Sequence, residues 1–82
     1  MKYKVELKPK AVKDLKGLPQ ADQRHMVQKL EVLATDLQGD VKKMTNFSPE
    51  YRLRVGTWRA LFEVEGNKII VYRILHRSKA YS

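Results

Sequence analysis

The residues of this sequence that are best suited to chemistry are arginines, a histidine and a tyrosine in the last third of the chain. Arg52, Arg54 and Arg59 lie within eight positions of each other. A C-terminal group follows them, made up of His76, Arg77, Lys79 and Tyr81. Guanidinium groups bind phosphate oxygens through paired hydrogen bonds, histidine transfers protons near neutral pH, and aromatic rings stack on nucleobases. These residue types predict a site for a phosphodiester with a base beside it.

A predicted hairpin brings the three arginines together. Apolar and polar residues alternate over 51–55 and 58–65, as in half-buried strands, and a Gly-Thr pair between them is typical of a two-residue turn. In this register Arg54 lies opposite Arg59, with Arg52 on the same face. Like charges directly opposite each other destabilise a sheet. The cluster therefore indicates an anion site, with a solvated basic face as the alternative.

A third strand of the meander is expected over the apolar run 69–75, after a turn at Gly66-Asn67. Simple alternation from that turn extends the arginine face to four more residues, namely Leu61, Tyr72, Ile74 and His76. The same count places Arg73 on the core face, where it would need a partner or a route to solvent.

The whole pattern predicts one α+β domain over residues 1–82, with the order β-α-α-β-β-β. We expect a four-stranded, largely antiparallel sheet with two helices, 9–17 and 19–38, packed on one face. The first strand covers 2–8, and 41–50 is a connector anchored by Phe47. The predicted core includes Met26, Leu30, Leu33, Trp58, Phe62 and Val71.

Composition excludes several classes of protein. The 82 residues include 17 Lys and Arg against 9 Asp and Glu, a net charge of +8, and 43% are hydrophobic. There is no cysteine for a disulfide or a zinc ribbon, and two distant histidines make a poor metal site, so neither a metal nor another cofactor is expected. No apolar run approaches the about 18 residues that span a bilayer, and no signal-peptide core is present. We therefore expect a cytoplasmic protein that binds nucleic acid or an acidic partner rather than a membrane.

The order and spacing of these features resemble the RelE/ParE toxin superfamily. The run 51–59, the Phe62-Glu63-Val64 segment after it, Lys8-Pro9 near the start and His76-Arg77…Tyr81 at the end carry the resemblance, which covers essentially the whole chain. It implies the RelE-like microbial RNase fold and a toxin of a type II toxin–antitoxin pair. In the RelE branch such a toxin cuts mRNA in the ribosomal A site.

The resemblance also implies roles for individual residues. It makes Arg59, His76, Arg77 and Tyr81 catalytic, and Arg52, Arg54 and Lys79 RNA-binding. The best-known members carry a lysine pair where this chain has Arg52 and Arg54. Arginine stays protonated, so these two residues would bind phosphate, and proton transfer would pass to His76 or Tyr81. The expected reaction is metal-free attack of the substrate's 2′-OH on the adjacent phosphate.

Two other functions are consistent with the resemblance and the charge. One is a ParE-like toxin that inhibits DNA gyrase without cleaving anything, and the other is an RNA-binding module without chemistry. The expected partners of the favoured function are the ribosome, mRNA and a RelB-like antitoxin with an acidic or amphipathic helix.

Overall fold

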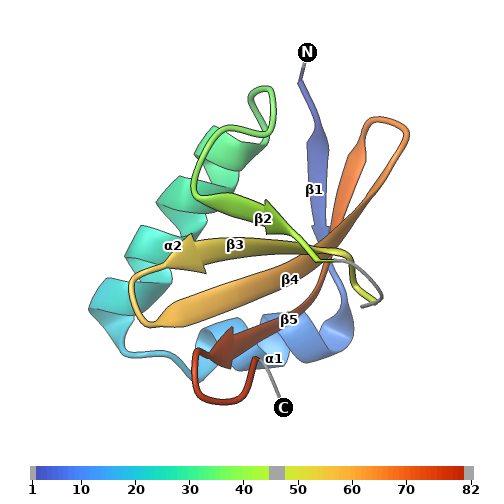
Figure 1. The fold of residues 1–82 in the computed structure, drawn as a ribbon. Coiled ribbons are helices and arrows are strands. Elements are labelled where there is room, and N and C mark those ends of the chain that lie inside the picture. Colours follow the sequence, from blue (N-terminus) through green and yellow to red (C-terminus); the bar gives the residue numbers. More distant parts are fainter. Residues whose placement is uncertain (1, 45–47, 81–82) are drawn as a thin grey trace.

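A five-stranded sheet forms one layer of the molecule and two helices form the other (Figure 1). The computed structural model describes residues 2–44 and 48–80. The strand order is β1-β5-β4-β3-β2. Their bounds are β1 Lys4–Leu7, β2 Val41–Lys43, β3 Tyr51–Val55, β4 Trp58–Glu65 and β5 Lys68–His76. Only β1 pairs in parallel, with β5; the other described pairings are antiparallel.

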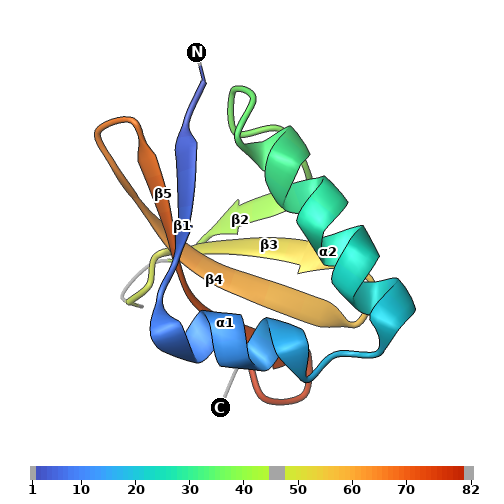
Figure 2. The same cartoon turned by 180° about the vertical axis from the view of Figure 1, so that it is seen from behind.

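Both helices lie on the same face of the sheet, as Figure 2 shows. Helix α1 spans Pro9–Lys16 and begins with proline, whose missing N–H has no partner in a first helical turn. Helix α2 spans Gln20–Leu33 and is shorter than the predicted 19–38. It ends early because Asp36 and Leu37 adopt left-handed backbone angles, with φ of 66° and 56°. Within the described residues, no helix is long and apolar enough to cross a membrane.

The core lies between α2 and the inner face of the sheet. Met26, Leu30 and Leu33 recur at helical spacing and are buried on one side of α2. They belong to the same cluster as Phe62 and Val71 of the sheet, so this part of the predicted core is confirmed. Trp58 is only half-buried and packs against the edge of that cluster.

The sheet contains one strand more than predicted. Val41–Lys43 forms β2 and pairs with β3, with Val41 opposite Leu53. We had expected a connector there because three residues carry too short a pattern to indicate a strand. Phe47, the predicted anchor of that connector, lies outside the described residues.

The register of the β3–β4 hairpin is as predicted. Arg54 pairs with Arg59, and Arg52 pairs with Leu61. Since residues directly opposite share a face, the three arginines lie on the same side of the sheet, turned away from the buried Leu53 and its neighbours.

The predicted register of β5 is wrong beyond its middle. A β-bulge changes the pairing there, with Phe62 opposite Val71 but Leu61 opposite Arg73. Tyr72 is the extra residue, and it reverses the alternation that follows. Arg73 therefore lies on the arginine face. Ile74 lies on the core face, as does His76, which pairs with Trp58.

Candidate nucleic-acid interface

The arginine face is less accessible than its composition predicts. Arg52 and Arg59 are 3% and 6% exposed, so both guanidinium groups lie within the protein. Arg54 is exposed and its Nε lies 3.4 Å from an Asp40 carboxylate oxygen. The structure thus brings the three predicted residues onto one face but presents only Arg54 of the three to solvent.

The two buried arginines bind main-chain carbonyl groups. Arg59 Nη1 donates to the carbonyl oxygens of Gly56 and Trp58, at 2.8 and 2.9 Å, and so holds the β3–β4 turn. Arg52 Nη2 donates to the carbonyl oxygen of Ala80 at 3.3 Å and contacts the C-terminal segment. These contacts give both residues a clear structural task.

The segment after β5, residues 77–80, turns back against the sheet. The Arg77 N–H donates to the Thr57 carbonyl at 2.8 Å, which joins this segment to the β3–β4 turn. Lys79 and Ala80 both donate their N–H groups to the His76 carbonyl. Arg77 and Lys79 have exposed side chains, whereas Ala80 is buried. Tyr81 lies outside the described residues.

His76 lies on the helix side of the sheet rather than on the predicted arginine face. Its ring meets Trp58 edge-on, with ring centroids 5.5 Å apart. Nδ1 lies 2.9 Å from Ser78 Oγ and accepts the Ser78 N–H at 3.2 Å. A hydroxyl can donate to Nδ1 or accept from it, so Ser78 can orient the ring in either charge state. Nε2 is then the nitrogen that His76 offers to another molecule.

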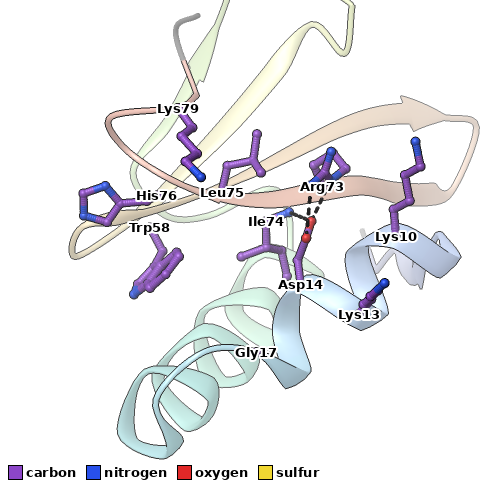
Figure 3. A pocket seen from close by; sticks show the side chains of 10 residues that line it. All are labelled: Lys10, Lys13, Asp14, Gly17, Trp58, Arg73, Ile74, Leu75, His76 and Lys79. Carbon is purple, nitrogen blue, oxygen red and sulfur yellow. Dashed lines mark hydrogen bonds and ion pairs between the residues drawn. The ribbon is translucent and has the colours of Figure 1, made fainter.

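His76 lines an open groove of about 610 Å³ between α1, the outer edge of β5 and the C-terminal segment (Figure 3). Lys10, Lys13, Arg73 and Lys79 contribute positive charges, Asp14 the single carboxylate, for a net charge of +3 with His76 neutral. Figure 3 shows the α1 lysines near one end of the groove, with His76 and Trp58 at the other. The remaining lining residues are Gly17, Ile74 and Leu75.

Asp14 fixes one wall of this groove. It receives two hydrogen bonds from Arg73, at 2.7 and 3.2 Å, and one from the Ile74 N–H at 3.0 Å. Burial of Asp14 opposes its ionisation, but the hydrogen bonds from Arg73 and Ile74, with the charges of Arg73 and Lys10, outweigh burial. The net effect lowers the pKa of Asp14 below its ordinary value of 3.8. The carboxylate is therefore neutralised by Arg73.

The site consequently differs from the predicted one in its members. His76 and Lys79 line the groove and Arg77 adjoins it in the chain, whereas Arg52, Arg54 and Arg59 are not part of its lining. Sequence reasoning missed Lys10, Lys13, Asp14 and Ser78. The lone Arg73 within an apolar run was the available signal, because it marks the place where simple alternation fails. Across residues 2–44 and 48–80, no three His, Cys, Asp or Glu side chains are grouped as metal ligands.

The chain matches known toxins over nearly its whole length. Residues 5–81 match the family described as the ParE toxin of the type II toxin–antitoxin system, parDE. Toxin RelE3 of Methanocaldococcus jannaschii is 36% identical, with 85% of each chain covered. The chain therefore belongs to this family of type II toxin–antitoxin toxins and is RelE-like within it.

Solved structures agree with that assignment. The RelB–RelE antitoxin–toxin complex from Methanococcus jannaschii contains a chain 33% identical to this one, with a TM-score of 0.76 and coverage of 92% and 93% of the two chains. The archaeal RelE–RelB complex from Pyrococcus horikoshii OT3 gives 26% identity, a TM-score of 0.79 and coverage of 98% and 100%. The two helices and the mixed sheet are those of the RelE fold.

Proposed function

We propose that this toxin acts in the cytoplasm by cleaving mRNA on the ribosome. The position of His76 carries the proposal, because a titratable ring, oriented by Ser78, lines a groove with a net charge of +3. Cations attract and hold RNA phosphates, and a positioned imidazole is the commonest protein group for moving a proton.

In the proposed reaction the 2′-OH of one nucleotide attacks the adjacent phosphorus and the bond to the 5′ oxygen breaks. The products are a 2′,3′-cyclic phosphate and a 5′-OH. His76 gives a proton to the departing 5′ oxygen from Nε2, and Nδ1–H then donates to Ser78 Oγ. Arg77 and Lys79, which follow His76 on the exposed segment, stabilise the charge that develops on the phosphate. Tyr81 completes the proposed set from the last residues of the sequence.

The remaining arginines receive different roles in this proposal. Arg59 holds the β3–β4 turn and Arg52 holds the C-terminal segment, so both position the residues that meet RNA. Arg54 is exposed and stays a candidate phosphate ligand outside the groove.

Gyrase inhibition is the second candidate, and the description of the matched family as ParE toxins favours it. The test adds the purified chain to a translation reaction with a defined mRNA, and to a gyrase supercoiling assay in parallel. Cleaved mRNA with unaffected supercoiling supports the proposal. Intact mRNA with blocked supercoiling supports the ParE-like function and contradicts cleavage.

We also propose that an antitoxin helix binds the apolar groove between α1, α2 and β1. This groove has a volume of about 300 Å³ and is lined by Val5, Leu7, Leu15, Val27, Leu30, Glu31 and Ala34. Val27 is 41% exposed, unusually open for a large apolar residue. The solved relatives are antitoxin–toxin complexes, and the charge of +8 favours an acidic amphipathic partner.

Two valines of α2 provide a matched test of this partner. Val27→Asp places a charge in the groove, so we expect it to weaken binding to the product of the adjacent reading frame by about tenfold or more. Val32→Asp is the control, since Val32 is 43% exposed on the same helix but does not line the groove. Equal affinities of the two variants, measured by calorimetry, would place the partner elsewhere.

A further inference from the structure

We infer that α1 contributes a second part of the RNA site, a track for the single-stranded backbone that leads along the groove to His76. Its identification as an mRNA track rests on the proposed function. Lys10 and Lys13, one turn apart on α1, both line the groove and both have exposed side chains. No feature of the sequence alone singled out these two lysines.

The electrostatics of the groove favour a polyanion. Its one carboxylate, Asp14, already receives two hydrogen bonds from Arg73. The α1 lysines therefore face the groove with no other acidic group among its lining residues. An anion with several charges spaced along a chain satisfies this arrangement better than a single small ion does, because the cations extend along α1 and then to Lys79.

The far end of the groove favours an unpaired base. Trp58 and His76 are the two aromatic residues in the lining, and they meet edge-on there. The Trp58 indole is fixed in place, since Nε1 donates to Asp22 Oδ2 of α2 at 3.0 Å. Cations beside aromatic rings are the arrangement that binds single strands, whose bases are free to stack. Duplex bases have no such freedom, so the track fits a single strand.

Trp58 also provides a direct readout, because it is the only tryptophan in the sequence and it lines the groove. The experiment titrates a single-stranded RNA, 2′-O-methylated so that it cannot be cleaved, into the full chain. Fluorescence anisotropy of a labelled RNA reports binding, and Trp58 emission reports occupancy of the groove. Cleavage is not measured, so a failure of the proposed function leaves this result interpretable.

The matched variants are Lys13→Glu and Lys16→Glu, which make the same charge change on the same helix. Both side chains are exposed, but Lys16 does not line the groove. We expect Lys13→Glu to weaken RNA binding on the order of tenfold and Lys16→Glu by less than about twofold, with the salt dependence reduced by about 0.7 per lost phosphate contact. Unchanged circular dichroism confirms that both variants fold.

Several outcomes decide the inference. Quenching of Trp58 by RNA, lost selectively in Lys13→Glu, supports the track, and equal affinity for single-stranded DNA supports recognition through the backbone. RNA binding without any change in Trp58 emission contradicts it, since the RNA would then lie elsewhere. Equal losses in Lys13→Glu and Lys16→Glu also contradict it, because only the overall charge would matter. Binding of an acidic peptide but not of RNA would assign the groove to a protein partner and overturn the proposal.

Discussion

His76 is held by a residue two positions further along the chain. The Ser78 N–H donates to Nδ1 and the Ser78 hydroxyl lies within hydrogen-bond distance of the same atom. Such local side-chain to backbone contacts are common where a strand ends in a turn. The turn therefore does more than reverse the chain, because it sets the orientation of the imidazole that lines the groove.

We predict that Ser78→Ala lowers the single-turnover rate of RNA cleavage by about tenfold, less than the about 100-fold or more expected for loss of an acid group. The ring loses its hydroxyl partner but keeps the Ser78 main-chain contact. Ser78→Thr retains the hydroxyl and should restore the rate. Affinity for the 2′-O-methylated RNA should not change, because Ser78 does not line the groove. A Ser78→Ala enzyme with the wild-type rate would show that this contact does not position His76.

At the scale of secondary structure, Asp14 joins α1 to the free edge of β5. Strand β1 pairs with β5 only as far as Val71, so the following residues of β5 have no strand on that side. Asp14 accepts the Ile74 N–H at this uncovered edge and also the Arg73 side chain. The helix thus caps the edge strand, a position that would otherwise expose unpaired main-chain groups.

We predict that Asp14→Asn destabilises the fold on the order of 1–2 kcal/mol at neutral pH, because charge-assisted hydrogen bonds are replaced by weaker ones. The folded protein holds the pKa of Asp14 below 3.8, so its stabilising effect is fully present above that pH. The effect is lost as pH falls through the folded-state pKa. Urea denaturation of wild type and variant should therefore differ at pH 7 and converge at low pH.

Asp40→Asn is the control for this prediction. Asp40 pairs with Arg54 at 3.4 Å, but its side chain is 63% exposed, so solvent weakens the interaction. We expect a change of less than about 0.5 kcal/mol at either pH. A stability difference for Asp14→Asn that stays constant with pH would show that the carboxylate charge is not the cause.

The bulge in β5 shows where sequence patterns stop being sufficient. The hairpin of β3 and β4 was predictable because a two-residue turn fixes its register, and Arg54 does pair with Arg59. A single extra residue, Tyr72, then reversed the faces of Arg73 and His76. Alternation counts along one strand and carries no information about a residue that its partner lacks. The burial of Arg52 was equally hidden, since it depends on a contact with Ala80, 28 positions away.

At the scale of the whole molecule, α1 separates two grooves of different chemistry. Leu15 lines the apolar groove toward α2, while Lys13 lines the cationic groove along β5. An antitoxin helix in the first groove therefore leaves the second to be controlled by other parts of the antitoxin. The concentration of positive charge in residues 51–82, seven basic against two acidic side chains, supplies the field that draws RNA toward the sheet.

The most direct test of the account compares the two histidines. Wild-type protein, His76→Ala and His25→Ala are each added to ribosomes translating a defined mRNA, and the new 5′ ends are mapped and checked for a 5′-OH. His25 is exposed on α2 and lines none of the grooves described. We predict that wild type and His25→Ala cut equally, and that His76→Ala loses about 100-fold or more of the cleavage rate while remaining folded. Cleavage by His76→Ala at the wild-type rate would contradict the assignment of proton transfer to this groove.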